Sequence, residues 1–359
     1  MKIAQVAPLY ESVPPKYYGG TERVVSYLTE ELLRQGHQVT LFASGDSVTR
    51  AKLVAPWPHA LRLDDQCVDQ LAPHMVLLQQ VFQQEHEAHP FDLIHFHIDY
   101  LHYPLTMQLH TPHVTTLHGR LDIPDLVPLY QTFSTIPVVS ISDSQRAPLP
   151  WLNWQGTVYH GLPDDLYTFR ETPGSYLAFL GRISPEKGVE QAIAIAQRAG
   201  MPLKIAAKVS EADQAYFCEV VQPLLDGPLI QCVGELREGQ KDDFLGQAYA
   251  LLFPIDWPEP FGLVMIEALA CGTPVIAYRR GSVPEVLEDG VTGWLVEGLE
   301  EAVQAVARVP MLSRTRCRQV FEARFTASRM AQDYVRIYQQ LVDERAGRAA
   351  ADTAGALSS

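Results

Sequence analysis

Residues 2–43, KIAQVAPLYESVPPKYYGGTERVVSYLTEELLRQGHQVTLFA, carry the pattern that decides the fold. Two short apolar runs, Lys2 to Ala7 and Val39 to Ala43, are typical of buried strands. The apolar positions between them recur at helical spacing: Val24, Val25, Leu28 and Leu32. Thr21 is a suitable N-cap for this helix, and Gly36 ends it. Strand, helix and strand in this order predict a βαβ unit, whose two strands lie parallel.

The same alternation continues along the chain. In the first half, strand-like runs follow at Leu93–His97, Val114–Leu117 and Val138–Ile141. Residues 161–174 lack apolar periodicity and are interpreted as a linker. A second series then begins, with strand-like runs at Tyr176–Leu180, Leu203–Ala207, Leu229–Val233, Ala250–Pro254 and Val275–Ala277.

This pattern predicts an α/β protein of two doubly wound, Rossmann-like domains. We expect an N-terminal domain over residues 1–165 and a C-terminal domain over residues 170–327. A last helix over about 328–345 is expected to pack back on the first domain, and residues 346–359 to form a frayed tail. Ligands of such sheets bind at the carboxyl ends of the strands, so a ligand between the two domains is expected.

Composition excludes several classes of function. Hydrophobic residues make up 47% of the chain and charged residues 19%, which indicates a globular protein. The net charge of −14 argues against nucleic acid as a partner. The five cysteines contain no C-x-x-C pair, which favours a reducing compartment. No signal peptide and no run of 18 apolar residues is present, so we expect a cytoplasmic protein without an integral membrane segment.

The stretch Asp256–Glu267, DWPEPFGLVMIE, contains the strongest candidate site. Prolines on both sides of Glu259 favour a rigid extended loop there. A helix can start near Phe261, which places Glu267 about two turns inside it. The backbone N–H groups at its start are those of Gly262, Leu263 and Val264, which suit an anion such as a diphosphate. The alternative is an ordinary turn at Glu259 and a helix with a solvated Glu267.

Two further segments offer groups for phosphate. Gly181–Gly188, GRISPEKG, follows a predicted strand and supplies Arg182 as a bidentate donor and Lys187 as a point charge. The alternative is a solvated turn. Gly19 and Gly20 precede the first helix, where the backbone can approach a phosphate, although a loop that needs positive φ explains two glycines equally well. No G-x-G-x-x-G follows the first strand, which disfavours a nicotinamide dehydrogenase.

Histidines lie within one predicted strand and directly after another. His118 follows the second of these strands and can hydrogen-bond a reacting sugar. His95 and His97, with Asp99 nearby, lie on one side of a strand as metal ligands would, but no third ligand is evident and a buried strand explains them better. The chain also has no Asp-x-Asp. We therefore expect no metal in the site, and a diphosphate neutralised by Arg182 and Lys187.

These segments resemble the retaining GT-B glycosyltransferases of family 4 over nearly the whole chain. The most specific element is the E-x7-E signature, Glu259 to Glu267, with Phe261, Gly262 and Leu263 inside it. Residues 268–276, ALACGTPVI, and 281–285, GSVPE, match as well. The resemblance implies a GT-B fold, with two Rossmann-like domains facing each other across a cleft.

The resemblance also implies roles for individual residues. Glu259 would hold hydroxyls of the donor sugar and Glu267 the ribose, while Arg182 and Lys187 would bind the diphosphate. Gly20 would complete the phosphate site and His118 would lie beside the anomeric carbon. Two residues after a strand, Glu235 and Leu236, would lie near the base. Lys208 departs from the family pattern, because many members have a small residue there.

The activity implied is transfer of a hexose from a nucleotide sugar, with UDP-glucose or a related UDP-hexose favoured, to an unidentified hydroxyl acceptor. The mechanism implied is metal-independent front-side displacement without a cofactor. Two alternatives use the same groups, a GT-B phosphorylase and a sugar-nucleotide epimerase. A third is a two-lobed solute-binding protein, which normally requires an export signal.

Overall fold

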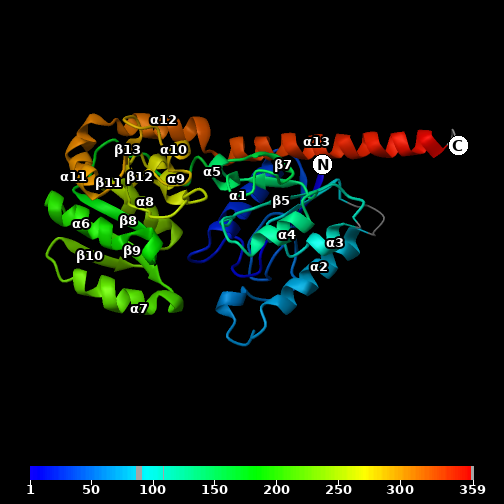
Figure 1. Cartoon of the computed structure of the whole chain (residues 1–359), viewed down its shortest axis with the longest axis horizontal. Coiled ribbons are helices and arrows are strands. Elements are labelled where there is room, and N and C mark those ends of the chain that lie inside the picture. The colour runs from blue at the N-terminus through cyan, green and yellow to red at the C-terminus, as the bar shows by residue number, and fades with distance from the viewer. Residues whose placement is uncertain (86–90, 108, 357–359) are drawn as a thin grey trace. The chain divides into compact units, whose positions relative to one another are not determined.

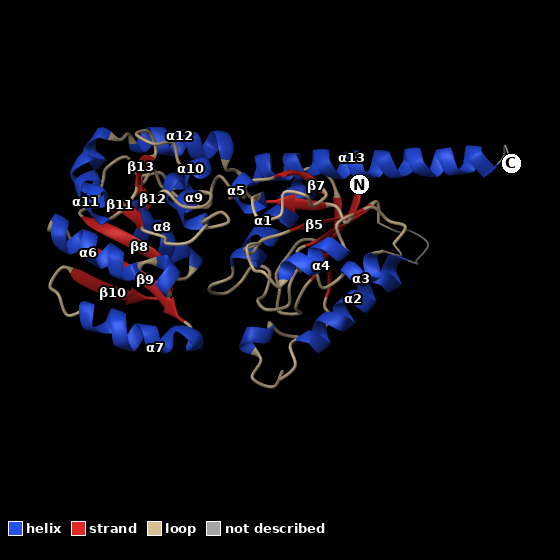
Figure 2. Ribbon diagram, in the orientation of Figure 1, coloured by secondary structure: helices blue, strands red, loops and turns tan. Residues whose placement is uncertain are grey.

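The computed structural model describes residues 1–85, 91–107 and 109–356 and divides into two compact units (Figure 1). Unit 1 comprises Met1–Ile141, Arg146–Tyr159 and Ala327–Ser359. Unit 2 comprises Ser142–Gln145 and His160–Thr326. In each unit a sheet lies between helices, as the ribbon coloured by secondary structure shows (Figure 2). Each unit is therefore an α/β layer structure of the kind that the sequence predicts.

Unit 1 is built on a seven-stranded sheet in the order β3-β2-β1-β4-β5-β6-β7, and its strand pairs are parallel. The strands are β1 (Lys2–Val6), β2 (Gln38–Phe42), β3 (Lys52–Val54), β4 (Leu93–Phe96), β5 (His113–Thr116), β6 (Val138–Ser140) and β7 (Trp154–Thr157). The five strands predicted in this half are confirmed. The edge strands β3 and β7 were not predicted, because polar residues and a glycine interrupt their apolar runs.

The helices of unit 1 cover this sheet. They are α1 (Gly20–Arg34), η1 (Leu61–Leu63), α2 (Leu71–Glu85), α3 (Tyr103–Thr106), α4 (Leu126–Thr132) and α13 (Ala327–Ala356). The predicted stripe of α1 is buried, but the N-cap is Gly19 rather than Thr21. The helix starts one residue earlier than Thr21 because Gly20 already takes helical geometry. Gly20 therefore opens the helix itself.

The last helix, α13, packs against α1 within unit 1. At its start Arg34 and Gln35 of α1 donate hydrogen bonds to the side chain and carbonyl of Ser328. The helix runs to Ala356, beyond the end at residue 345 that the sequence suggested, so residues 346–356 are helical rather than frayed. The physical reason is composition, since alanine and arginine are strong helix formers. Residues 357–359 lie outside the described residues.

Unit 2 is built on a six-stranded parallel sheet in the order β10-β9-β8-β11-β12-β13. The strands are β8 (Tyr176–Ile183), β9 (Leu203–Val209), β10 (Ile230–Gly234), β11 (Ala248–Phe253), β12 (Val275–Tyr278) and β13 (Gly293–Val296). The five predicted strands are confirmed and β13 was missed. Strand β8 extends to Ile183, so Arg182 lies in the strand and not in the loop after it.

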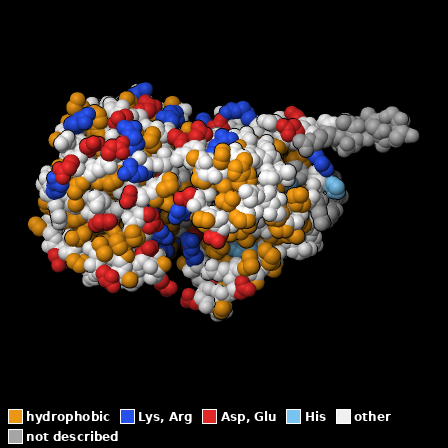
Figure 3. All heavy atoms as spheres, in the orientation of Figure 1, with side chains coloured by type: hydrophobic (Ala, Val, Ile, Leu, Met, Phe, Trp, Pro, Cys, Tyr) orange, Lys and Arg blue, Asp and Glu red, His pale blue; other side chains and the backbone are white. Residues whose placement is uncertain are grey.

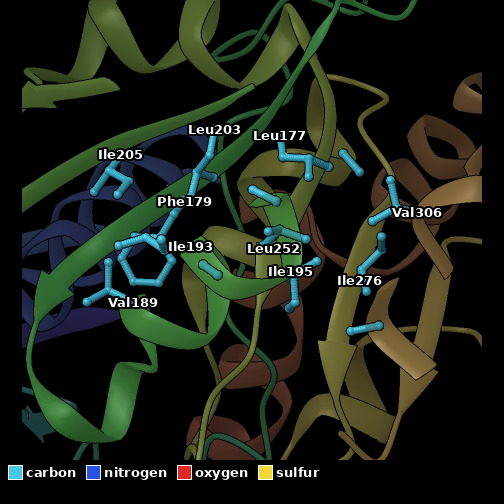
Figure 4. Close-up of a cluster of buried hydrophobic side chains, with 14 of the residues drawn as sticks. Leu177, Phe179, Val189, Ile193, Ile195, Leu203, Ile205, Leu252, Ile276 and Val306 are labelled. Carbon is cyan, nitrogen blue, oxygen red and sulfur yellow. The ribbon is translucent and has the colours of Figure 1, made fainter. Parts of the chain in front are cut away.

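The helices of unit 2 lie on both faces of its sheet. The longer ones are α6 (Val189–Ala199), α8 (Glu238–Gly246), α9 (Leu263–Ala270), α11 (Leu299–Arg308) and α12 (Arg314–Arg324). The shorter ones are α5 (Asp143–Arg146), η2 (Pro185–Lys187), η3 (Glu211–Asp213), α7 (Gln214–Tyr216), η4 (Phe217–Val221), η5 (Gln222–Leu224), α10 (Val283–Val286) and η6 (Val309–Met311). Figure 4 shows the core between α6, α11 and the sheet, where Leu177, Phe179, Ile193, Leu252 and Val306 are buried.

The segment predicted to be a linker, residues 161–174, is held by unit 2. The Arg314 guanidinium is buried and donates to the carbonyls of Arg170, Gly246 and Ala248. Arg318 donates to the carbonyls of Asp164 and Tyr167. A buried arginine that satisfies several carbonyls fixes a backbone that has no secondary structure of its own. The segment therefore belongs to unit 2 and is not a flexible connection.

The strand order places a topological switch point in each sheet. In unit 2 the chain leaves β8 toward β9 on one side and leaves β11 toward β12 on the other. In unit 1 the corresponding strands are β1 and β4. Loops that leave such a pair diverge, and ligands of doubly wound sheets bind between them. The candidate residues are therefore sought at the carboxyl ends of these strands.

The charge distribution on the surface and the apolar character of the helices relate to two partners that composition disfavours, nucleic acid and a membrane. On the face shown in Figure 3, Lys and Arg side chains lie among Asp and Glu side chains and form no continuous basic patch. Within residues 1–85, 91–107 and 109–356, no helix combines the length and the apolar character that a bilayer span needs.

Candidate functional site

The loop after β11 holds Glu259 at the switch point of unit 2. Glu259 stands between two prolines, as expected, and its backbone N–H donates to the Trp257 carbonyl over 2.8 Å. The turn before α10 packs against this loop. Ser282 N donates a hydrogen bond to the Glu259 carbonyl, and Ser282 Oγ donates one to the Phe261 carbonyl, each over 2.9 Å. A methyl group on Gly281 would lie 2.4 Å from the Glu259 nitrogen, so only glycine fits beneath the loop.

Lys187 and Glu259 form an ion pair across the switch point. Lys187 ends η2, the turn that follows β8, and its Nζ lies 2.5 Å from Glu259 Oε2. The indole N–H of Trp257 donates to the same oxygen over 2.9 Å. Both charged side chains are mostly buried, with 16% of Lys187 and 11% of Glu259 exposed. The structure thus brings together the two groups that the sequence assigned separately to phosphate and to sugar.

Arg182 points from β8 toward two carboxylates. Its Nη2 lies 2.5 Å from Glu186 and its Nε lies 3.5 Å from Asp213. In the sheet register Arg182 pairs with Lys208 of β9, so a second basic residue starts from the adjacent strand position. The Arg182 side chain is 37% exposed and can exchange these partners for another anion.

The N-terminus of α9 follows the Glu259 loop. The helix begins at Leu263, two residues later than expected, because Gly262 adopts φ +80 as its N-cap. Glu267 is therefore the fifth helical residue and lies about one turn inside, not two. Leu263 and Val264 are the first helical residues, and their N–H groups have no acceptor within the helix. The Phe261 ring is buried against His160 and Phe325, so it supports the loop from the core.

Glu267 has a lysine partner that the sequence did not reveal. Lys241 of α8 reaches across to Glu267, with Nζ 3.1 Å from Oε1, and lies 3.7 Å from Glu238. The Glu267 side chain is only 4% exposed. The residues assigned to the base, Glu235 and Leu236, lie between β10 and α8, at the same edge of the sheet. A lysine one turn into the helix after that segment is the signal that could have been used.

In unit 1 the candidate glycines open α1. Gly19 is the N-cap and is buried, whereas Gly20 is the first helical residue and is exposed. The first turn also contains Glu22, which is buried and whose pKa burial raises to about 7. Helix α1 thus presents backbone N–H groups, beside a carboxyl that is readily protonated near neutral pH.

His118 follows β5 and contacts His97, which follows β4. The two rings lie with His97 Nδ1 and His118 Nε2 2.9 Å apart. Although part of His118 is accessible, its ring is surrounded closely enough that burial lowers its pKa to about 3. His118 is therefore neutral over the physiological range, and it can donate or accept a hydrogen bond without carrying a charge.

His95 and His97 stack on one side of β4, with ring centroids 3.9 Å apart. The two nitrogens of His95 contact Tyr338 and Thr116, and those of His97 contact Gln5 and His118. Their lone pairs and protons are thus used inside the protein rather than for metal. Over the described part of the chain, no cluster of three or more His, Cys, Asp or Glu side chains has a metal-binding arrangement.

Two family profiles match the chain, one in each half. The profile of "Glycosyl transferases group 1" matches residues 169–318, and that of "Glycosyltransferase Family 4" matches residues 18–154. Between them they cover the loops that carry the candidate residues of both units.

Characterised relatives agree with these profiles. The N-acetyl-alpha-D-glucosaminyl L-malate synthase of Bacillus anthracis is 24% identical over 97% of this chain and its own full length. The alpha-maltose-1-phosphate synthase of Mycobacterium tuberculosis is 29% identical over 44% of this chain and 47% of its own length.

Solved structures share the fold. A sucrose-phosphate synthase from Thermosynechococcus elongatus superposes with a TM-score of 0.77 at 20% identity, covering 96% of this chain and 99% of its own. A glycosyltransferase of avilamycin A biosynthesis gives 0.74 at 24% identity, covering 95% and 98%. HepE of Anabaena, solved with UDP and glucose, superposes with a TM-score of 0.70 at 19% identity, covering 95% of this chain and 100% of its own. With these matches in both halves, the chain belongs to the family-4 glycosyltransferases of the GT-B fold.

Proposed function

We propose that this glycosyltransferase transfers a hexose from a UDP-sugar to a hydroxyl acceptor with retention of configuration, and that unit 2 binds the donor. The observation that carries the proposal is the pair of lysine–carboxylate contacts, Lys187 with Glu259 and Lys241 with Glu267, on the two sides of the α9 N-terminus. In each contact a lysine, which can bind phosphate, is paired with a carboxylate, which can accept hydrogen bonds from hydroxyls.

Donor binding would replace these contacts. A diphosphate between the loops after β8 and β11 offers Lys187 and Arg182 a stronger partner than a single carboxylate, and it meets the N–H groups of Leu263 and Val264. Glu259 is then free to accept from sugar hydroxyls, and Glu267 from the ribose. Because Lys187 and Arg182 supply the positive charge, the diphosphate is neutralised without a metal ion.

The chemistry we propose is a front-side displacement. The acceptor oxygen attacks the anomeric carbon while the bond from that carbon to the diphosphate oxygen breaks. The acceptor's proton passes to the departing diphosphate, so no protein carboxylate has to act as nucleophile or base. Arg182, Lys187 and the α9 N-terminus stabilise the charge that develops on the leaving group.

Unit 1 contributes through His118, Gly19 and Gly20. We assign His118 to hydrogen bonding with the reacting sugar and the two glycines to the donor phosphates. The protonated form of Glu22 is compatible with an anion at the start of α1, because it carries no charge. The five cysteines are free thiols, and we propose a cytosolic enzyme.

The choice of UDP and of retention draws on the relatives. HepE was solved with UDP and with glucose, and the Bacillus anthracis relative is named for an alpha-linked glucosaminyl product. Nucleotide hexoses of the UDP-glucose kind are alpha-linked, so an alpha product corresponds to retention. The names of the relatives include malate and phosphorylated sugars as product moieties, and they do not converge on one acceptor.

A donor screen tests the proposal. Release of free nucleotide from UDP-, GDP- and ADP-hexoses is followed in EDTA, with and without simple sugar acceptors. Hydrolysis of a UDP-hexose in EDTA is the expected result. Silence from every donor, or activity that only Mg²⁺ restores, would contradict it.

The site assignment has a matched pair of variants. Lys187→Ala should weaken UDP binding by about 10- to 100-fold, since a hydrogen bond to a charged group contributes about 1.5–3 kcal/mol. Lys204→Ala removes the same charge from the start of β9, the opposite edge of the same sheet, where Lys204 stacks on Tyr176, and should leave the affinity unchanged. Equal affinities for the two variants, measured by calorimetry, would reject the site.

A further inference from the structure

A continuous row of hydrogen-bonded side chains starts at the half-buried His118 and crosses the interior of unit 1. His118 Nε2 lies 2.9 Å from His97 Nδ1, and His97 Nε2 lies 2.8 Å from Gln5 Oε1. Gln5 Nε2 in turn donates to Tyr338 Oη over 3.3 Å. The row thus connects the loop after β5, the loop after β4, strand β1 and helix α13.

The row continues beyond Tyr338. Tyr338 Oη lies 2.7 Å from His95 Nδ1, and His95 Nε2 lies 2.7 Å from Thr116 Oγ1. Thr116 Oγ1 then contacts Tyr334 Oη over 2.9 Å. Tyr334 and Tyr338 are one turn apart on α13, so one face of that helix supplies two members of the row.

Apart from the half-buried His118, the members of this row are buried, and no carboxylate, lysine or arginine belongs to it. Gln5, His95, Thr116, Tyr334 and Tyr338 have no exposed surface, and His97 is 2% exposed. Burial lowers the pKa of His95 well below its usual value and raises that of Tyr338 well above it. An imidazole or a hydroxyl in such a row donates one hydrogen bond along it and accepts one, so the direction of one contact sets the direction of its neighbours.

The orientation of Gln5 sets that direction. Its carbonyl oxygen faces His97, so His97 Nε2 must carry the proton and donate it to Gln5. A neutral His97 then has an acceptor at Nδ1, and His118 must donate to it from Nε2. On the other side, the Gln5 amide donates to Tyr338, whose hydroxyl then donates to His95 Nδ1. The single direction gives His118 one tautomer, with its proton on Nε2 and an acceptor at Nδ1.

We propose that Gln5, His97 and Tyr338 are positioning residues for His118, which they hold in the Nε2–H tautomer and in one ring orientation. This inference rests on the proposed role of His118. Stability alone does not explain the row, because an apolar core at these positions would have no polar group to satisfy. Helix α13 thereby takes part in preparing the site, through Tyr338, although it is the last element of the chain.

The test of the tautomer uses nitrogen NMR on the full chain labelled with ¹⁵N-histidine. The chain has 12 histidines, and the spectrum of His118→Gln identifies the signals of His118. In the wild type we expect Nε2 protonated and Nδ1 unprotonated. In Gln5→Met and in Tyr338→Phe the signals should shift toward a mixture of tautomers. A proton on Nδ1 in the wild type, or an unchanged tautomer in both variants, would overturn the proposal.

The kinetic arm uses the donor that the screen identifies. Tyr338→Phe should lower kcat about tenfold and change the donor KM by less than about twofold, as expected for a group that orients another. Tyr334→Phe removes an equally buried hydroxyl from the far end of the row, leaves Gln5, His97 and His118 bonded, and should keep kcat near the wild-type value. Equal kcat values for these two variants would overturn the positioning role.

The two arms separate this inference from the proposed function. If the wild type turns over no UDP-hexose, the proposed function fails while the NMR arm still reports the tautomer. If the wild type is active and Tyr338→Phe shifts the tautomer without lowering kcat, the positioning role is overturned and the transferase stands.

Discussion

The polar groups at the carboxyl edges of the two sheets differ in charge and in what surrounds them. In unit 1, His118 is half-buried, its neighbours are buried, and hydrogen bonds join them along β1, β4 and α13 without a lysine, an arginine or a carboxylate. In unit 2, Glu259 and Glu267 are each bonded to a lysine at the edge of the sheet. Both arrangements satisfy buried polar atoms, but only the second uses full charges.

The difference shows how each unit can serve a ligand. A neutral buried row gains nothing from opening, since each member would lose a partner that the ligand cannot replace. A lysine–carboxylate pair can open without loss if the ligand supplies an anion for the lysine and hydroxyls for the carboxylate. We therefore propose that unit 1 is a fixed support, and that unit 2 exchanges its internal partners for the donor.

The largest effect is expected where unit 2 combines a strained backbone with its charged loop. Gly281→Ala would place a methyl group 2.4 Å from the Glu259 nitrogen, in a backbone with φ +53, and should cost more than about 3 kcal/mol of stability. Gly200 also has a positive φ, +66, but no atom lies within 4 Å of an added methyl group. Gly200→Ala should therefore cost only about 1 kcal/mol of stability. Urea unfolding measures both, and equal costs would refute the close packing beneath Glu259.

A smaller effect is expected when the neutral row is broken. Tyr338→Phe leaves His95 Nδ1 and the Gln5 amide without their partner and should destabilise unit 1 by about 2 kcal/mol. Hydrogen exchange followed by mass spectrometry should show faster exchange in unit 1 alone. UDP affinity, which we assign to unit 2, should not change. A loss of UDP affinity equal to that of Lys187→Ala would show that unit 1 is not a separate, fixed support.

The pH dependence of stability should also distinguish the neutral row. Folding lowers the pKa of His95 and His118, so below pH 6.5 these two side chains bind more protons in the unfolded chain than in the folded one. Stability is then present at neutral pH and lost as the pH falls, by about 1.4 kcal/mol per pH unit for each such group. The urea concentration at the midpoint of unfolding is measured at pH 7.5 and at pH 5.5, and it should be lower at pH 5.5.

Glu22 works in the opposite direction and provides the control. Its pKa rises to about 7 in the fold, so its contribution is present at low pH and lost as the pH rises through 7. Glu22→Gln should therefore steepen the loss of stability on acidification. A midpoint that is independent of pH in both proteins would show that the buried histidines are not held neutral by the fold.

The sequence predicted most of the fold and located the charged candidate residues Glu259, Glu267, Lys187 and Arg182. Apolar runs located ten strands, whereas Lys52 in β3, Gly156 in β7 and Gly293 in β13 interrupt the runs that would have indicated these strands. Glu259 could be placed because flanking prolines restrict the backbone. The start of α9 was misplaced by two residues, since the N-cap depends on the positive φ of Gly262.

Partners across the sheet could not be predicted. Lys187 follows β8 and Glu259 follows β11, and these strands become neighbours only through the strand order of the whole unit. Lys241 contacts Glu267 through the packing of α8 on α9, which no local pattern expresses. The row behind His118 joins residues 5, 97 and 338, and only the folded chain brings them together.

The most direct test of the account is calorimetric titration of UDP, in EDTA, into the wild type and into Glu267→Gln. Glutamine keeps the shape of the side chain and removes the charge that we assign to the ribose. We expect the wild type to bind UDP and Glu267→Gln to bind it at least about tenfold more weakly. Equal affinity in the two proteins, or no binding of UDP to the wild type, would contradict the assignment of the donor to unit 2.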